Sequence, residues 1–250
     1  MTELQSAGGV RRRPHIAVVI GGEPVEQVIP PGAFDCVIAA DSGLDLAERM
    51  GWTVDLVVGD LDSVSPGALR RARDADITVM DYPEDKDSTD FELAMRLAAV
   101  FLDDSPAPFI SVVGGAGGRL DHLMANLAVL TSDRWLGIEV TAWIGRAWVG
   151  VIREHRQIET VAGTEISLLA WHGDADGVTT HGLEWAISMD ILQAGWSLGT
   201  SNRAVSDQVD ISVLEGVLTA TIADITLVDP ELRVTPSSHP QPNSPEVTPR

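Results

Sequence analysis

The chain of 250 residues contains a single cysteine, Cys36, which lies inside the apolar run 36–40. A lone cysteine cannot form a disulfide within the chain, so a disulfide-stabilised fold is excluded and we expect Cys36 to be a core residue in a reducing compartment. The sequence also has no apolar run of about 18 residues and no signal-peptide pattern at its start. These absences predict a cytoplasmic protein that does not cross a membrane.

Basic residues are scarce, because 17 Lys and Arg stand against 37 Asp and Glu for a formal net charge of −20. Such a charge repels nucleic acid and anionic membrane surfaces unless a local basic patch opposes it. The one basic run, residues 11–13, belongs to an N-terminus (1–14) that we expect to be flexible. We therefore expect neither nucleic acid nor a membrane as a partner. The hydrophobic content of 44% is enough to build folded cores.

Residues 15–135 alternate short apolar runs with helical patterns. The apolar runs lie at 16–20, 36–40, 56–58, 77–80 and 109–113. Between the last two, the apolar positions of 91–102 keep the i, i+3, i+4, i+7 spacing of one helix face. Continuous apolar strands that alternate with helices indicate a parallel sheet covered on both faces. This half of the sequence therefore predicts a Rossmann-like three-layer α/β domain.

Residues 136–228 show strand-like runs separated by turn residues. The runs lie at 138–144, 148–152, 165–170, 178–180, 195–201, 209–213 and 217–222. Turn signals at 162–163 and 173–177 break them, which favours an antiparallel β-sandwich as a second domain. Six of the seven tryptophans also lie between Trp135 and Trp196, so the core composition changes along the chain. The proline-rich tail, 229–250, is predicted to be disordered.

Acidic residues follow several of the predicted strands directly. Asp41 follows the run 36–40, Asp60 and Asp62 follow 56–58, Asp90 follows 77–80 after a loop, and Asp121 follows 109–113. Ligands bind beyond the carboxyl ends of parallel strands, because loops and helix N-termini converge there. Five carboxylates on one rim would oppose folding unless a cation is present. A divalent ion such as Mg²⁺ prefers oxygen ligands and substrate phosphates.

The same rim carries features suited to a phosphate group. The glycine-rich stretch 114–118 lets backbone N–H groups approach an anion, and Lys86 and Arg119 supply positive charge. No GxxxxGK[ST] or GxGxxG string is present, so the site is neither a P-loop nor a dinucleotide fingerprint. Zinc-ligand spacing and a GxSxG nucleophile elbow are also absent. The pattern predicts a Mg²⁺-nucleotide site of another kind.

Each of these motifs also has a purely structural interpretation. Residues 41–43 are ordinary turn formers, Thr89 with Glu92 fits a capping box, and Asp121 could be the N-cap of a helix. Any one loop alone supports both interpretations. The concentration of carboxylates at the ends of neighbouring strands is what favours the functional interpretation.

The ordered motifs resemble those of thiamine pyrophosphokinases. The motifs are DSG at 41–43, GDLDS at 59–63, KDSTDFE at 86–92 and GGRLDH at 117–122, followed by ISLL at 166–169, GLEW at 182–185 and GTSN at 199–202. The resemblance runs in unbroken order from about Ile16 to Ile222. Many relatives have another residue at Ser42, and tyrosine is common at Trp185. Neither departure removes a charge or an aromatic face.

The resemblance implies an ATP-binding α/β domain, a thiamine-binding β-sandwich and a homodimer with active sites between subunits. It implies transfer of the diphosphate of ATP to the hydroxyl of thiamine, which gives thiamine diphosphate and AMP. The implied Mg²⁺ ligands are Asp60, Asp62 and Asp90. The implied ATP-binding residues are Asp41, Ser42, Gly43, Asp62, Ser63, Lys86, Asp87, Thr89, Gly117, Gly118 and Arg119.

For the acceptor, the resemblance implies contacts from Asp90, Asp121, Trp185, Ser201 and Asn202, the last three from the sandwich domain of the partner. Arg119, Asp90 and Asp121 are the implied catalytic residues, and either carboxylate could accept the alcohol proton. A tryptophan face attracts the thiazolium cation. The structural alternatives are a core role for Trp185 and a simple turn at 201–202.

Two other functions remain open at this stage. One is a Mg-ATP-dependent kinase or diphosphokinase that acts on another small alcohol. The other is a non-catalytic nucleotide or metabolite sensor, which would bind ATP without turnover. The nucleotide product distinguishes them, because diphosphate transfer releases AMP whereas a simple kinase releases ADP.

Overall fold

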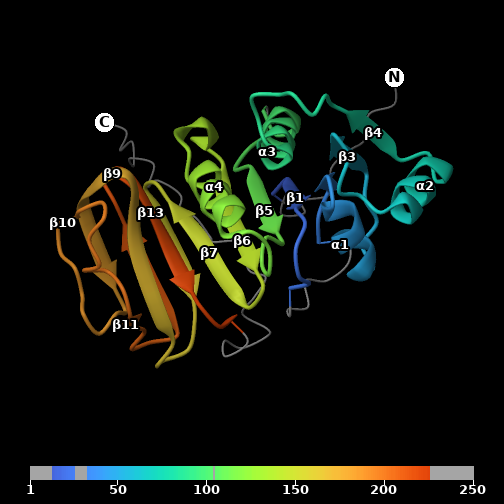
Figure 1. Ribbon diagram of the computed structural model, residues 1–250. Coiled ribbons are helices and arrows are strands. Elements are labelled where there is room, and N and C mark those ends of the chain that lie inside the picture. Colours follow the sequence, from blue (N-terminus) through green and yellow to red (C-terminus); the bar gives the residue numbers. More distant parts are fainter. Residues whose placement is uncertain (1–12, 26–32, 104, 226–250) are drawn as a thin grey trace, which may run out of the picture.

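The computed structural model describes residues 13–25, 33–103 and 105–225. Six parallel strands form one half of a mixed sheet (Figure 1). They are β1 (His15–Val19), β2 (Cys36–Ala40), β3 (Leu56–Gly59), β4 (Thr78–Asp81), β5 (Phe109–Val113) and β6 (Glu139–Ile144), in the spatial order β4-β3-β2-β1-β5-β6. Two runs chosen from sequence, 36–40 and 109–113, coincide with β2 and β5. The predicted tail and most of the predicted N-terminus lie outside the described residues.

Four helices cover the two faces of this parallel half. They are α1 (Gly43–Arg49), α2 (Pro66–Asp74), α3 (Asp90–Phe101) and α4 (Leu120–Leu130). Ala17 and Val19 of β1 share a core cluster with α1 and α2, whereas the intervening Ile16 and Val18 share one with α3 and α4. The strands are therefore buried on both faces, which is why they appear as continuous apolar runs.

Local capping sets where two of the helices begin. Thr89 Oγ1 accepts a hydrogen bond of 3.2 Å from the Glu92 N–H, and the Ser65 hydroxyl accepts one from Ala68 N–H at the start of α2. The alternative in which Asp121 is an N-cap is excluded, because α4 begins at Leu120 and Arg119 occupies the N-cap without a side-chain bond. Asp121 lies in the first turn instead, where its charge still favours the helix dipole.

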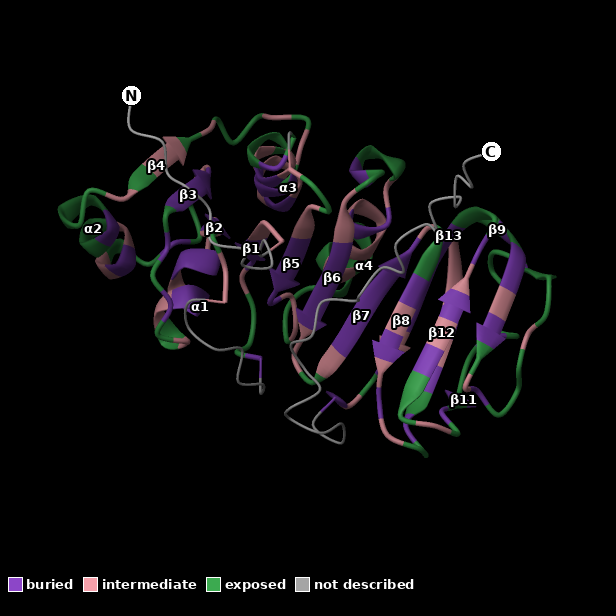
Figure 2. Cartoon of the chain, turned by 180° about the vertical axis from the view of Figure 1, so that it is seen from behind, coloured by how far each residue is buried: buried purple, intermediate pink, exposed green. Residues whose placement is uncertain are grey.

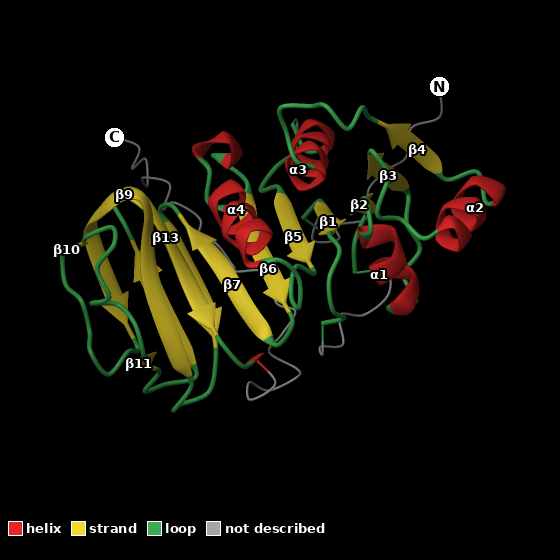
Figure 3. Cartoon of the chain, viewed as in Figure 1, coloured by secondary structure: helices red, strands yellow, loops and turns green. Residues whose placement is uncertain are grey.

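The second half of the sheet is antiparallel and contains no α-helix within the described residues (Figure 3). It consists of β7 (Ala147–Ile152), β8 (His155–Glu159), β9 (Glu165–His181), β10 (Asp190–Leu192), β11 (Asn202–Arg203), β12 (Gln208–Ser212) and β13 (Glu215–Ile222). The strand order continues as β6-β7-β13-β9-β12-β8, and β10 and β11 pair with β9. The buried strand centres are visible from behind in Figure 2.

The two halves share one continuous network of backbone hydrogen bonds. Strand β6 pairs in parallel with β5 and antiparallel with β7, so Ala142 lies opposite both Val112 and Val149. A hairpin, rather than a separate linker, therefore joins the parallel part to the antiparallel part. Among the described residues, no helix is both long enough and apolar enough to cross a membrane.

Two sequence-based expectations for the antiparallel half are wrong. Residues 195–201 form turns and irregular loop rather than a strand, and Gly195 there has φ of 79°. Residues 173–177 do not end a strand, since β9 runs from Glu165 to His181. The left-handed backbone at His172 and Gly177 bends β9 there instead of breaking it.

Candidate functional site

A cleft of about 720 Å³ lies at the carboxyl ends of the parallel strands. Its walls are the segments after β1, β2, β3, β4 and β5 and the N-terminal turns of α3 and α4. Eleven residues predicted for the site line it: Asp41, Ser42, Asp60, Asp62, Ser63, Lys86, Asp87, Thr89, Asp90, Gly118 and Arg119. The carboxyl ends of the parallel strands therefore bring together residues that span almost 80 positions of the sequence, as the strand-end rule predicts.

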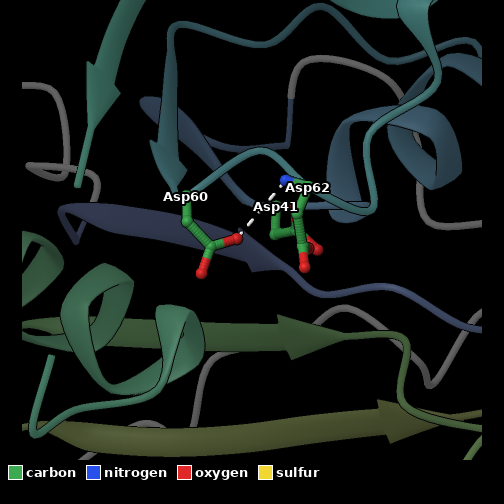
Figure 4. A group of neighbouring side chains, drawn as sticks. All are labelled: Asp41, Asp60 and Asp62. Carbon is green, nitrogen blue, oxygen red and sulfur yellow. Dashed lines mark hydrogen bonds between the residues drawn. The ribbon is translucent and has the colours of Figure 1, made fainter. Parts of the chain in front are cut away.

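Three carboxylates form a compact group at the centre of this cleft (Figure 4). One oxygen from each of Asp41, Asp60 and Asp62 lies within 4.8 Å of the others. Asp62 donates its backbone N–H to Asp60 Oδ1 at 3.3 Å, and Asp41 Oδ1 is buried without a hydrogen-bond partner among the described residues. Oxygen donors in this arrangement suit a hard divalent cation.

Gly59 allows this crowding because it has no side chain. A Cβ at Gly59 would lie 3.1 Å from the carboxyl carbon of Asp90 and 3.2 Å from Cβ of Asp41, and its φ of 150° is itself unusual for other residues. The glycine thus lets Asp41, in the loop after β2, and Asp90, at the start of α3, approach β3 closely. The motif at 59–63 therefore begins with glycine because a larger residue would collide with Asp41 and Asp90.

One residue of the carboxylate group and one neighbour of the group adopt the left-handed backbone conformation. Asp41 has φ of 47° and Leu61 has φ of 64°. Such a conformation costs about 1 kcal/mol or more for residues other than glycine, although aspartate tolerates it best. Asp41 is held in place by its backbone N–H, which donates to the Val58 carbonyl at 2.9 Å. Strain of this kind is common where side chains must point at a ligand.

Lys86 supplies positive charge to the acidic group. Its Nζ lies 2.7 Å from Asp60 Oδ2 and 3.1 Å from Asp90 Oδ1, and its side chain is only 14% exposed. The hydrogen bond from Lys86 lowers the pKa of Asp60. Burial raises the pKa of Asp41, and the nearby charges of Asp90 and Asp62 raise it further. The cleft therefore holds Asp60, whose ionised form is stabilised, close to Asp41, whose ionised form is destabilised.

The glycine-rich loop after β5 lies against the loop after β1. Gly114, Gly115 and Gly117 all have positive φ, and the Gly115 N–H donates to the Gly21 carbonyl at 2.8 Å. A Cβ at Gly22 would approach the Ala116 carbonyl oxygen to 2.6 Å. Only glycines allow two loops to run this close together, and the contact shapes one wall of the cleft.

Several cleft-lining residues outside the predicted set lie in three places. They are Gly21 and Gly22 in the loop after β1, Glu84 in the loop after β4, and His122 and Asn126 of α4. His122 belongs to the predicted motif at 117–122, but the sequence assigns it no role in the site. Gly21 and Gly22 follow the strand run 16–20 directly, so the strand-end rule would have found them had it been applied to glycines as well as to acids. Glu84 carried no signal, because it lies in a loop rich in charged residues.

Some predicted site residues do not line the cleft. Gly43 packs against β1, where a Cβ would lie 2.0 Å from the Val19 carbonyl oxygen, and Gly117 faces the Glu23 side chain. Asp121 is exposed and accepts two hydrogen bonds from Arg119 across the helix start. That contact lowers the pKa of Asp121. Asp121 therefore belongs to the edge of the site in this chain.

The three predicted residues from the second half lie together in the antiparallel part of the fold. Asn202 Oδ1 accepts the Trp185 backbone N–H at 3.1 Å, and its Nδ2 donates to the Trp185 carbonyl at 2.7 Å. Ser201 has φ of 55° and donates its N–H to the Ser167 hydroxyl at 3.0 Å. These bonds hold the Trp185 backbone while its side chain stays exposed, at 56% for the residue. A core role for Trp185 is thereby excluded.

Comparison with known proteins gives a consistent picture. The family model described as "Thiamin pyrophosphokinase, catalytic domain" matches residues 33–141, and "Thiamin pyrophosphokinase, vitamin B1 binding domain" matches residues 152–218. Thiamine pyrophosphokinase 1 of Oryza sativa subsp. japonica is 25% identical over 66% of this chain and 64% of its own length. Thiamine pyrophosphokinase of Bacillus subtilis is 25% identical over 64% of this chain and 74% of its own.

Solved structures share the fold. The crystal structure of thiamine pyrophosphokinase from Bacillus subtilis superposes with a TM-score of 0.71 at 22% identity, covering 84% of this chain and 99% of that one. Yeast thiamin pyrophosphokinase gives a TM-score of 0.66 at 14% identity, covering 90% and 89%. The chain spans just under two thirds of the length of the rice relative that it matches.

Proposed function

Because the chain belongs to the thiamine pyrophosphokinase family, we propose that it transfers the diphosphate group of ATP to the hydroxyl of thiamine, giving thiamine diphosphate and AMP. The observation that carries this proposal is the group of Asp41, Asp60 and Asp62 in one cleft with Lys86 and a glycine-rich loop. Carboxylates can bind the metal ion, a lysine can bind phosphate oxygens, and glycines let the backbone approach the polyphosphate closely.

The donor set fits Mg²⁺. Asp60 and Asp62 belong both to the family-based ligand set and to the observed group, so we propose them as metal ligands, with Asp90 completing the set once Lys86 turns to a phosphate oxygen. The unpartnered buried oxygen of Asp41 supports a cation at this position. When bound, the ion would orient the polyphosphate and neutralise charge on its bridging oxygens.

The chain's own residues then position the reacting groups. Lys86 and Arg119 would hold phosphate oxygens, and Ser42, Ser63, Asp87, Thr89 and Gly118 would shape the rest of the ATP site. Attack at the β-phosphorus requires the alcohol in line with the departing AMP. Of the two candidate bases, we favour Asp90, because it lines the cleft whereas Asp121 is exposed and bound to Arg119. Asp121 would instead hold Arg119 in place.

Thiamine would be held by the other half of the fold. We propose that the ATP-binding Rossmann-like domain predicted for residues 15–135 also includes β6, because β6 pairs in parallel with β5, and that the antiparallel strands from β7 onward form the β-sandwich that binds thiamine. Trp185 belongs to the antiparallel half and does not line the nucleotide cleft of its own chain. A homodimer in which Trp185, Ser201 and Asn202 of one copy face the cleft of the other would complete the site. The exposed indole would stack on the thiazolium cation, worth roughly 0.5 to 2 kcal/mol.

The deciding experiment identifies both products. Protein incubated with ATP, Mg²⁺ and thiamine should form thiamine diphosphate and AMP in equal amounts, and chelation of the metal should stop the reaction. Formation of ADP with thiamine monophosphate would replace the proposal with a simple kinase. ATP binding without turnover on thiamine or related alcohols would favour a nucleotide sensor.

A further inference from the structure

A second cavity, of about 580 Å³, lies at the opposite end of α4 from the nucleotide cleft. It is lined by the segment after α4, which includes η1 (Asp133–Trp135), and by Arg153, the bend of β9 at 171–174, and the first residues of β13. The nucleotide cleft uses Arg119, His122 and Asn126 near the start of α4, whereas this cavity begins at Thr131. The two cavities share no lining residue. A volume of this size accommodates a small organic molecule.

Arg153 brings a partly desolvated positive charge into this cavity. Its guanidinium donates one hydrogen bond of 2.7 Å, to the neutral Ser132 carbonyl, and it has no ion pair within 4.0 Å among the described residues. Burial lowers the pKa of Arg153, and the charge of Asp133 opposes that effect. A guanidinium carries five N–H donors, so most of its capacity is available for a ligand.

Arg156, three residues further along the chain, is also buried, but its charge is balanced by a carboxylate. Its guanidinium contacts Glu139 at 3.0 Å and donates to the carbonyls of Val140 and Val151. Arg153 follows β7 and Arg156 lies in β8, and of these two only Arg156 has a carboxylate at ion-pair distance within the described part of the chain. The charge of Asp133 acts on Arg153 without a direct ion pair, so a ligand oxyanion in contact with the guanidinium would offset more of the cost of its burial.

The other walls combine the Trp171 ring with polar side chains that are held in place by hydrogen bonds. The Trp171 indole N–H donates to Thr219 Oγ1 at 2.9 Å, which orients the ring. The His172 ring nitrogen Nε2 contacts Thr131 Oγ1 at 3.0 Å and the Ala128 carbonyl at 3.2 Å, which anchors the β9 bend to the end of α4. Asp174 also lines the cavity, but its Oδ1 accepts the Ala194 N–H at 2.9 Å. The cavity wall is therefore preorganised on several sides.

From these contacts we propose that this cavity is a second binding site, which takes a small organic oxyanion through Arg153, with its apolar body against Trp171. A carboxylate or a phosphate offers two oxygens to the guanidinium fork, and the flat indole suits an aromatic body. The site is independent of the nucleotide cleft and of the reaction proposed there.

Binding is tested by nuclear magnetic resonance of the whole chain, with the Trp171 indole N–H signal assigned by its loss in Trp171→Phe. Benzoate should shift this signal saturably, with a Kd of about 1 mM or tighter, and benzylamine, which has a similar shape and the opposite charge, should not. Phenyl phosphate in a parallel titration distinguishes a phosphate preference from a carboxylate preference.

Variants separate this site from the nucleotide cleft. Arg153→Met should weaken benzoate binding at least about tenfold, and Arg153→Lys, which keeps the charge but loses the fork, should weaken it less. Lys86→Met should leave it unchanged. Equal binding of benzylamine, absence of any saturable shift, or loss of binding in Lys86→Met rather than Arg153→Met would overturn the proposal. Melting temperatures of the variants show whether each remains folded.

Discussion

Lys86 Nζ lies 2.7 Å from Asp60 Oδ2, so the chain places its own cation against the acidic group that would bind a metal. Both side chains are about 15% exposed, which strengthens the attraction relative to a surface pair. The same ammonium lies 3.1 Å from Asp90 Oδ1, four residues further along the chain. Lys86 is thus a structural counter-ion as well as a candidate phosphate ligand.

Replacing Lys86 with methionine should damage both activity and stability. We expect turnover to fall by roughly 10² to 10³, because charge on the phosphates loses a partner. The melting temperature at pH 7 should fall by about 2 to 4 °C. Lys86 lowers the folded-state pKa of Asp60, so the stability it adds is present above about pH 4 and is lost as the pH falls further.

Thermal melts of wild type and Lys86→Met at several pH values check this sign, since the two curves should converge in acid. Lys86→Arg is the matched control, because it keeps the charge. A stability difference that grows in acid would show that Lys86 acts through something other than Asp60.

Asp41→Asn should have the opposite effect on stability. Burial and neighbouring carboxylates raise the pKa of Asp41 in the folded state, so its ionised form destabilises the fold at neutral pH. Asparagine removes that charge and tolerates the left-handed backbone at this position. We expect a gain of roughly 0.5 to 1 kcal/mol at pH 7, kept small because solvent screens the half-buried group.

The gain should shrink as the pH falls, because protonation of Asp41 relieves the same repulsion in wild type. Turnover should fall sharply at the same time, since a candidate metal-binding oxygen is replaced. Denaturant unfolding at neutral and acid pH, together with an AMP-release assay, measures both effects. A variant less stable than wild type at neutral pH would contradict the assigned cause of the raised pKa.

Gly59→Ala tests the steric role of the glycine. The new methyl group would approach the Asp90 carboxyl carbon to 3.1 Å at a φ of 150°, so we expect a loss of roughly 1 to 3 kcal/mol in the free energy of unfolding and a large fall in turnover. Gly51→Ala is the control, because Gly51 has φ of 70° but no atom near the added methyl. It should lose stability with little loss of turnover, and equal losses of turnover would refute the crowding argument.

Asp62→Ala should abolish diphosphate transfer without unfolding the protein. Asp62 is exposed, and its carboxylate accepts a hydrogen bond of 2.9 Å from the Ser63 hydroxyl, so we expect the fold to tolerate its loss. Asp85→Ala removes an exposed carboxylate that does not line the cleft and should retain activity. Circular dichroism and product analysis report both properties. Wild-type turnover in Asp62→Ala would remove this residue from the metal site.

Trp185→Ala should raise the KM for thiamine by roughly 3- to 30-fold, the range expected for a lost cation–π contact, and leave the KM for ATP unchanged. Trp196→Ala removes a tryptophan of similar exposure from a nearby loop and should change neither value. Steady-state kinetics with each substrate varied in turn provide the comparison. An unchanged KM for thiamine in Trp185→Ala would show that the indole does not hold the acceptor.

Sequence reasoning succeeded where the signal is local. Strands β2 and β5 are continuous apolar runs buried on both faces, and the acids that follow β2 and β3 must converge because parallel strands end at one edge. It failed at 195–201, where apolar residues such as Trp196 and Leu198 remain exposed in turns. Apolar character predicts burial only when some other element is available to cover it, and that depends on distant parts of the chain.

The join between the halves was equally hidden from the sequence. The sequence does not show whether β6 is the last strand of its sheet or pairs with a further strand. The structure shows that β7 pairs with it, with Val149 opposite Ala142. The pairing of Asn202 with the Trp185 backbone is non-local in the same way. The residue types predicted that Trp185 and Asn202 belong to the site, but not that the Asn202 side chain holds the Trp185 backbone in place.

The hairpin of β6 and β7 also limits where the chain can be divided or recombined with a relative. The two family models meet inside it, one ending at 141 and the other beginning at 152, where Thr141 pairs with Gly150. Cutting the chain there would leave each piece with a bare strand edge, a template for aggregation. The parallel and antiparallel halves are therefore not independent units, and we expect a chimera with a relative to fold only where the whole hairpin comes from one parent.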